Sequence, residues 1–162
     1  MLPRRDLVVT PGSSETASIH QFEFEIEIAA PTARVWQALT DEINAWWLPD
    51  FRAVGADSVV TFDAQPGGLL IERMPDGSGL VWYTVQMTQP GKAIYLVGHT
   101  APDWGGPKLS MLKLSLESRG EATVLKVSET VMGRLGKDPH ATEQGWRQLF
   151  GGGLKRYVEE ST

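Results

Sequence analysis

Four side chains in this sequence are placed where a proton could be exchanged inside a folded core. His99 ends the strand-like run Tyr-Leu-Val-Gly-His, Glu72 and Glu129 interrupt or end apolar runs, and Tyr83 lies within another. A histidine titrates near neutral pH and burial raises the pKa of a carboxyl group, so these groups could serve as acids, bases or orienting donors. His99 could instead lie at a rim and bond to backbone or water, and the two glutamates could be exposed or paired with Arg73 or Lys126.

Other catalytic chemistries have no support in the sequence. It contains no cysteine and no Gly-x-Ser-x-Gly elbow. The histidines His20, His99 and His140 are far apart and form no spaced ligand pair, so neither a metal nor another cofactor is expected. The glycines at 151–153 lack the Lys and the Ser or Thr that follow a phosphate loop.

Seven strands are predicted to carry these side chains. The clearest covers residues 21–28, where Phe22, Phe24, Ile26 and Ile28 alternate with three glutamates. Turn residues separate six further strand-like runs, at 58–62, 69–73, 80–88, 93–99, 109–117 and 122–130. Short connections of this kind are typical of an antiparallel meander.

Three helices complete the prediction. Two short ones follow the first strand, beginning at Pro31 and at Asp41, and Pro49 ends the second. A long amphipathic helix is predicted over residues 138–160. Its three glycines at 151–153 each cost roughly 1 kcal/mol relative to alanine, which predicts a kink or a close approach to the helix backbone.

Length and charge limit the class of protein. The chain has 162 residues, 41% of them hydrophobic, which suits one domain with room for an internal pocket. A net charge of -5 without a basic stripe argues against nucleic acid. No membrane span or secretory signal is visible, and the lack of cysteine favours the cytoplasm. Residues 1–19 are expected to form a flexible arm before a single domain at 20–162.

The order of several short motifs resembles one family. They are Ala30-Pro31 with Val35-Trp36, Trp46-Trp47, Pro66-Gly67-Gly68, the turn at Pro90, Thr123, and Gly145-Trp146. Through them, residues 21–160 resemble the START-like (SRPBCC) superfamily of polyketide cyclases and the birch-pollen allergen, and within it the activator of heat shock protein 90 ATPase homologues. The resemblance implies an α+β helix-grip fold. In that fold a curved antiparallel sheet of about seven strands wraps a long C-terminal helix, with two short helices after the first strand.

A sheet curved around a helix leaves a cavity wherever the helix does not fill it, and such cavities are mostly apolar. Alternate strand positions and aromatic residues of the helices are expected to line the cavity, although most of them could be ordinary core. The expected set is Trp47, Tyr83, Val85, Met87, Tyr95, Val97, His99, Leu112, Leu114, Trp146, Phe150 and Tyr157.

Three functions are compatible with this sequence. The first is noncatalytic binding of a small apolar or aromatic molecule. The second is a cochaperone-like activator of the heat shock protein 90 ATPase, for which Trp104 and the loop at 105–107 would supply an exposed contact. The third is a cyclase, dehydratase or hydrolase that uses His99, Glu72, Tyr83 or Glu129 as acid and base. A homodimer is also compatible with the sequence, which shows no interface.

Overall fold

The computed structural model describes residues 11–161 and contains one seven-stranded antiparallel sheet, in the order β1-β7-β6-β5-β4-β3-β2. All neighbours in this order except β1 and β7 are also consecutive along the chain, as a meander requires. The strands are β1 (Ser18–Ile28), β2 (Val59–Phe62), β3 (Leu69–Arg73), β4 (Gly79–Gln89), β5 (Ala93–Thr100), β6 (Lys108–Arg119) and β7 (Ala122–Gly133).

The first strand has one buried face and one solvent-exposed face, as its alternation predicts. Phe24 and Ile28 are buried, while Glu25 and Glu27 point outward and form ion pairs with Arg119 of β6. The strand begins at Ser18, a little earlier than its predicted start. Residues 11–17 have no helix or strand, and residues 1–10 of the expected arm lie outside the described residues.

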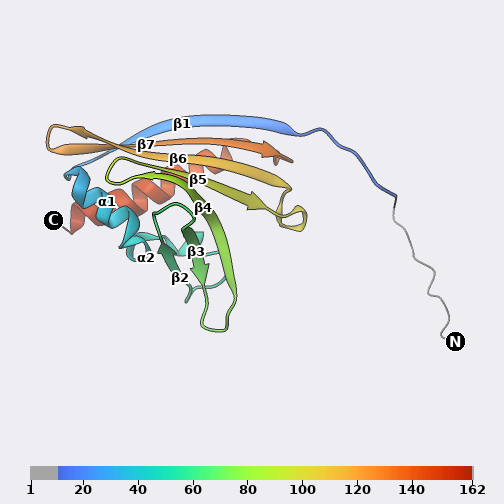
Figure 1. Ribbon diagram of the computed structural model, residues 1–162, viewed down its shortest axis with the longest axis horizontal. Coiled ribbons are helices and arrows are strands. Elements are labelled where there is room, and N and C mark those ends of the chain that lie inside the picture. The colour runs from blue at the N-terminus through green and yellow to red at the C-terminus, as the bar shows by residue number, and fades with distance from the viewer. Residues whose placement is uncertain (1–10, 162) are drawn as a thin grey trace.

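The two short helices follow β1 and cover one end of the sheet (Figure 1). They are α1 (Thr32–Thr40) and α2 (Ile43–Trp46), followed by a 3-10 turn, η1 (Pro49–Phe51). Pro31 precedes the first turn of α1, where the missing N–H of proline has no helical partner to lose. Thr123 Oγ1 donates to the Ala30 carbonyl oxygen at 2.7 Å and so fixes the entry of α1 against β7.

The C-terminal helix runs from α3 (Ala141–Gln148) through a π-helical segment, η3 (Leu149–Lys155), into α4 (Arg156–Glu160). It starts three residues after the predicted position because Asp138 Oδ1 accepts the His140 N–H in a turn before the helix. The glycine run lies in the π-helical segment. A Cβ atom on Gly153 would stand 2.6 Å from the Trp46 carbonyl oxygen, so α2 crosses this helix where only glycine fits.

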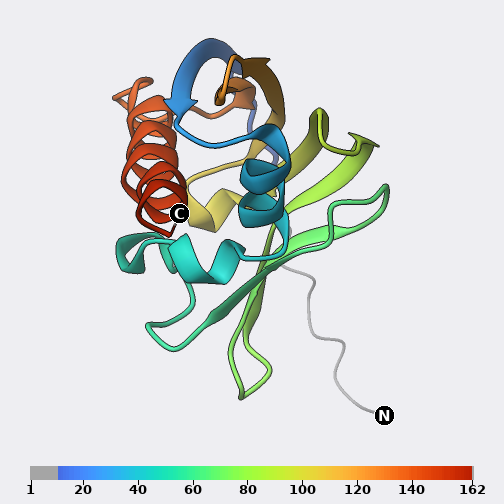
Figure 2. The same cartoon turned by 90° about the vertical axis from the view of Figure 1, so that its left-hand side faces the viewer.

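The sheet wraps around the C-terminal helix, which lies in its concave face, with α1 and α2 beside it (Figure 2). Buried residues of the helix meet the inward side chains of the strands and form the core. The helix contributes Trp146, Leu149, Phe150, Leu154 and Val158. The predicted α+β helix-grip fold is therefore confirmed. No helix within residues 11–161 is both long and apolar enough to cross a membrane.

The sheet opens between β4 and β5. These strands pair only from Thr84 with Val97 to Gln89 with Ala93. Residues 79–83 of β4 pair with β3 alone, and residues 98–100 of β5 pair with β6 alone. The β2–β4 part of the sheet consequently diverges from the remaining strands, as Figure 1 shows, and a 3-10 turn, η2 (Pro102–Trp104), follows β5 at the opening.

Candidate ligand-binding site

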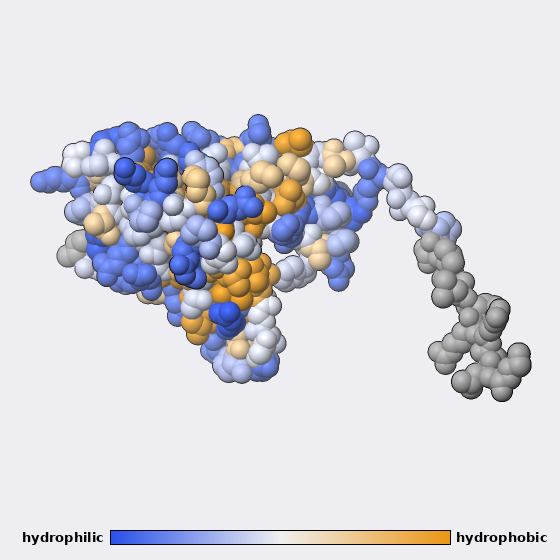
Figure 3. Space-filling model, in the orientation of Figure 1, coloured by the Kyte–Doolittle hydropathy of each residue, from blue (hydrophilic) through white to orange (hydrophobic). Residues whose placement is uncertain are grey.

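A pocket of about 330 Å³ lies where β4 and β5 separate. In Figure 3 this face of the molecule is hollowed between the β2–β4 part and the η2 loop, and hydrophobic residues border the hollow. The walls come from β4, β5, β6, β7, the η2 turn and the first turn of α3. Its lining residues include Leu80, Trp82, Tyr83, Gly98, Trp104, Lys108, Ser110, Glu129 and Thr142.

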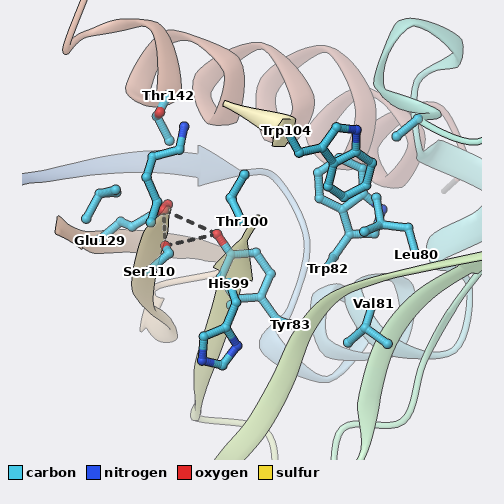
Figure 4. A pocket seen from close by; sticks show the side chains of 14 residues that line it. Leu80, Val81, Trp82, Tyr83, His99, Thr100, Trp104, Ser110, Glu129 and Thr142 are labelled. Atoms are coloured by element: carbon cyan, nitrogen blue, oxygen red, sulfur yellow. Dashed lines mark hydrogen bonds between the residues drawn. The ribbon is translucent and has the colours of Figure 1, made fainter. Parts of the chain in front are cut away.

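The pocket has an apolar end and a polar end. Figure 4 shows Leu80, Trp82 and Trp104 together at one side, and Glu129 and Ser110 near Thr142 at the other. The ring of Tyr83 lies between the two ends, with its hydroxyl group directed to the polar one. A ligand that fills this space would need an apolar body and a polar group.

A β-bulge in β4 makes the aromatic wall. Leu70 pairs with Tyr83, but the next residue of β3, Ile71, pairs with Val81, which leaves Trp82 without a partner. The consecutive side chains of Trp82 and Tyr83 can then point to the same face of the sheet, which regular alternation does not allow. Trp82 contacts the Trp47 ring at 5.7 Å between centroids, and Tyr83 contacts the Trp146 ring at 6.0 Å.

A second pocket of about 210 Å³ adjoins the first, since both are lined by Trp82, Tyr83 and Thr142. It lies between the bulge of β4, the segment around η1 and the helix α3, and its walls are almost entirely apolar. Its other lining residues are Trp47, Phe51, Gly145, Trp146 and Leu149. Tyr83 is therefore part of the wall of both pockets.

Glu129 is the polar centre of the site. It is 2% exposed, and three side chains donate hydrogen bonds to its carboxylate. Tyr83 Oη lies 3.2 Å from Oε1, Ser110 Oγ bonds the same oxygen, and Trp146 Nε1 bonds Oε2. Burial raises the pKa of Glu129 above its ordinary value, and the hydrogen bonds from Ser110, Trp146 and Tyr83 and the charge of Lys108 offset this only in part.

The same environment keeps Tyr83 protonated. Its burial, and secondly the charge of Glu129, raise the pKa of the phenol well above its ordinary value. Tyr83 also lies 3.2 Å from Ser110 Oγ. Room for the ring comes from Gly98 of β5, because a Cβ atom there would stand 3.0 Å from a Tyr83 ring carbon and 2.7 Å from the Trp82 carbonyl oxygen.

Glu72 lies outside both pockets and holds the aromatic wall from behind. Its carboxylate accepts from the N–H groups of Ala53 and Val54, from Ser58 Oγ at 2.7 Å and from Trp82 Nε1 at 3.1 Å. Burial acts to raise the pKa of Glu72, but these four hydrogen bonds outweigh it and lower the pKa below its ordinary value. Glu72 is therefore a positioning residue for Trp82.

His99 does not join the polar cluster. It borders the first pocket, but its side chain is exposed, and Figure 4 shows the imidazole directed away from the Tyr83 hydroxyl group. Of the proposed acid-base residues, the structure brings together Glu129 and Tyr83 only. Trp47 and Trp146, from the expected lining set, lie on the wall of the second pocket.

The predicted inward face of β5 is wrong. Ile94 and Leu96 are buried in the core, and they pair with the inward residues of β6. Tyr95 and Val97 therefore point to the convex side, where Lys113 Nζ lies 5.1 Å from the centroid of the Tyr95 ring. The strand is apolar on both faces, so alternation does not distinguish them.

Met87 also points to the convex side, contrary to the prediction. A second irregularity in β4, between Val85 and Met87, shifts the register by one residue. Met87 pairs with the outward Tyr95 and is 41% exposed, whereas Val85 pairs with Leu96 and stays buried. A one-residue bulge moves every later side chain of a strand to the other face.

The remaining members of the expected set lie away from both pockets. Leu112, Leu114 and Phe150 are core residues, as is Val85. Tyr157 of α4 packs against the edge of the core and donates its hydroxyl hydrogen to Glu42 at 2.9 Å. These residues support the fold and not the site.

Sequence reasoning missed the polar wall formed by Lys108, Ser110 and Thr142. A signal for the first two exists, because they occupy the same alternating positions of β6 as the buried Leu112 and Leu114. A polar start to an otherwise apolar strand face indicates the polar end of a cavity. Thr142 has no such signal, since its place depends on how α3 meets the sheet.

A metal site has no structural basis in the described part of the chain. Among residues 11–161, no group of three or more His, Asp or Glu side chains lies close enough to hold an ion.

Comparison with solved structures supports the fold. A protein from Rhizobium leguminosarum, described as putative and uncharacterized, shares 18% identity with a TM-score of 0.63, covering 90% of this chain and 99% of its own. Ara h 8.0201 shares 18% identity with a TM-score of 0.58, covering 87% and 98%. DynU16, a putative protein in the dynemicin biosynthetic locus, shares 22% identity with a TM-score of 0.64, over 88% of this chain and 48% of its own.

At these identities the likeness concerns the fold alone. No curated protein matches the sequence. A family model does match, over residues 29–159, and its description is activator of Hsp90 ATPase homolog 1-like protein. That range begins just before α1 and ends within α4, and so includes the bulge, both pockets and Glu129. The chain therefore belongs to the family of activator of Hsp90 ATPase homolog 1-like proteins.

Proposed function

We propose that the protein binds a small, largely aromatic molecule in the pocket between β4, β5 and the start of α3. The observation that carries the proposal is the division of one pocket into an aromatic end, with Trp82 and Trp104, and a hydrogen-bonded end, with Ser110 and Glu129. Apolar walls with a few placed polar groups are typical of small-molecule sites. The pocket volume of about 330 Å³ is near the lower end for such sites, which favours a compact ligand.

Trp104 gives the proposal a direct test. It is 56% exposed at the pocket mouth, so a ligand ring packed on it removes apolar surface from water without disturbing the core. A thermal-shift screen of aromatic compounds, lipids and polyketides, supported by native mass spectrometry, identifies a ligand. We then expect Trp104→Ala to weaken its binding by about twofold to tenfold, the range for one aromatic contact.

The matched control is Tyr95→Ala, which removes an aromatic side chain from the convex face and should leave the affinity unchanged. Two results would count against the proposal. One is that no compound raises the melting temperature. The other is that the two variants weaken binding equally, since the contact would then not be at the pocket mouth.

Acid-base catalysis on the bound molecule is a second candidate, and the buried Glu129 with its raised pKa is the observation that favours it. Tyr83 and Ser110 contact this carboxyl group, whereas Glu72 and His99 lie outside the cluster. A cyclase, dehydratase or hydrolase of this kind would lose turnover in Glu129→Gln. Mass spectrometry of each bound compound after incubation tests it, and unchanged compounds in the wild-type protein would remove it.

The family description suggests a third candidate, activation of the Hsp90 ATPase, and Trp104 beside the loop at 105–107 is the exposed feature that could contact a chaperone. The ATPase rate of Hsp90 with the wild-type protein and with Trp104→Ala tests it. No stimulation by the wild-type protein would exclude this function. Action in the cytoplasm and self-association stay predictions from the sequence.

A further inference from the structure

The polar end of the pocket is built from two hydroxyl groups that share one carboxylate oxygen. Tyr83 Oη and Ser110 Oγ lie 3.2 Å apart, and both bond to Glu129 Oε1. All three side chains line the first pocket. The other oxygen, Oε2, accepts from the indole of Trp146, which lines the second pocket.

The direction of each hydrogen bond follows from the groups involved. An indole N–H only donates and an ionised carboxylate only accepts. Tyr83 keeps its proton, because its burial and the charge of Glu129 raise the pKa of the phenol. With Glu129 ionised, Tyr83 and Ser110 both donate to Oε1. Each hydroxyl group has then used its single hydrogen, and its oxygen can only accept from a ligand.

The pocket also holds donors near this end. Lys108 and Thr142 line the same pocket, and the charge of Lys108 acts on Glu129. A ligand hydroxyl group suits both sets of partners, since it can donate to Tyr83 or Ser110 and accept from Lys108 or Thr142. An ether oxygen of the same shape can only accept, and would leave the two protein oxygens without a donor after water is displaced.

We propose that the pocket selects aromatic ligands that carry a hydroxyl group, such as phenols, over ethers of the same shape. This inference rests on the proposed function and names the ligand class for the same site. A hydroxyl that donates to a carboxylate becomes a stronger acceptor, because hydrogen bonds in a chain polarise one another. A site built to hydrogen-bond a hydroxyl group also discriminates strongly against analogues that lack it. We expect a preference of about tenfold.

The probes are 2-naphthol and 2-methoxynaphthalene, titrated into the full chain by isothermal calorimetry. The wild-type protein should bind the naphthol about tenfold more tightly. In Glu129→Gln the amide N–H donates to one of the two hydroxyl oxygens. That hydroxyl group can then donate its own hydrogen to the ligand, and an ether oxygen can accept it, so the preference for the naphthol should fall below about threefold. The control Glu23→Gln changes an exposed glutamate of β1 and should keep the wild-type preference.

A second variant, Ser110→Ala, removes one of the two acceptors at a half-buried position and should also reduce the preference, which covers the case that Glu129→Gln does not fold. Equal binding of the two probes to the wild-type protein would overturn the inference and leave the proposed function in place. A preference that persists in both variants would also overturn it. If neither probe binds while another compound of the thermal-shift screen does, the inference fails and the proposed function stands.

Discussion

Two glutamate carboxyl groups are buried under the same sheet, and their pKa values move in opposite directions. Glu72 receives four hydrogen bonds, two of them from backbone N–H groups of a loop, and these outweigh the cost of burial. Glu129 receives three from side chains, which do not outweigh it. The first residue is suited to hold structure, and the second to respond to a ligand or a proton.

The raised pKa of Glu129 predicts a pH-dependent stability. Because the folded state binds this proton more tightly than the unfolded chain, the stabilisation is present below the ordinary value of 4.5 and is lost as pH rises through the raised value. Glu129→Gln has no such loss. We expect the free energy of unfolding of the wild type, relative to this variant, to fall with rising pH above 4.5, by about 1.4 kcal/mol per unit of raised pKa.

Urea unfolding at a series of pH values measures this difference. The titratable and charged groups that act on Glu129 are Tyr83 from β4 and Lys108 from β6, and the raised pKa of the Tyr83 phenol keeps that group neutral over this range. Glu23→Gln, at an exposed position of β1, is measured in the same series as the control. A difference between wild type and Glu129→Gln that stays constant with pH would show that the carboxyl group is not strained by burial.

Truncation of Glu72 is expected to destabilise the protein, because its carboxylate is the acceptor of four hydrogen bonds in the folded state. Glu72→Ala leaves two backbone N–H groups, the Ser58 hydroxyl group and the Trp82 indole without their acceptor. We expect a loss of about 3 kcal/mol in the free energy of unfolding, since each buried unpaired donor costs about 1–3 kcal/mol and the loop can recover part of this from water. Ser58→Ala, which removes one donor of the four, should cost less. Equal losses in urea unfolding would contradict this account.

At the scale of elements, the opening between β4 and β5 makes the site. The bulge at Trp82 adds a second aromatic side chain to the concave face, and the pairing with β5 starts only at Thr84. Gly98 on the opposite strand leaves the space that the Tyr83 ring occupies. The pocket therefore depends on three local departures from a regular sheet.

The π-helical segment gives a matched test of packing at this scale. A Cβ atom on Gly153 would stand 2.6 Å from the Trp46 carbonyl oxygen, whereas one on Gly152 would meet only a Leu48 methyl group at 3.8 Å. We expect Gly153→Ala to destabilise the protein by about 1–3 kcal/mol, as overpacking does. Gly152→Ala should be neutral or stabilise it by up to about 1 kcal/mol. Thermal unfolding of both variants checks this, and equal melting temperatures would show that α2 does not constrain the helix.

At the scale of the whole molecule, the fold could be predicted and much of the site could not. The alternation from Phe22 to Ile28 and the polar turns between later strands determine a meander, and the last amphipathic segment has only the concave face of the sheet to cover. The pocket walls depend on contacts between elements that are far apart in the sequence. Neither the bulge at Trp82 nor the inward face of β5, which reads as apolar on both sides, is encoded in a local period.

The candidate residues illustrate the same limit. Glu72 and Glu129 look alike in sequence, as single glutamates at the inner positions of strands, and both are buried. Only the loop that reaches Glu72 from residues 53–58 and the helix that brings Trp146 to Glu129 distinguish their roles. His99 borders the first pocket but does not join the polar cluster, because its exposed imidazole points away from the Tyr83 hydroxyl group.

The central claim is that an aromatic ligand occupies the space between β4, β5 and α3, and the six tryptophans report on it directly. Nuclear magnetic resonance resolves their indole N–H groups in one spectrum. Titration with 2-naphthol should shift the signals of Trp82 and Trp104, and those of Trp47 and Trp146 at the second pocket. The signals of Trp36 and Trp46 should stay in place, since neither borders these two pockets and Trp46 Nε1 is bonded to the Ala38 carbonyl oxygen. No saturable shift, or shifts centred on Trp36 and Trp46, would contradict the account.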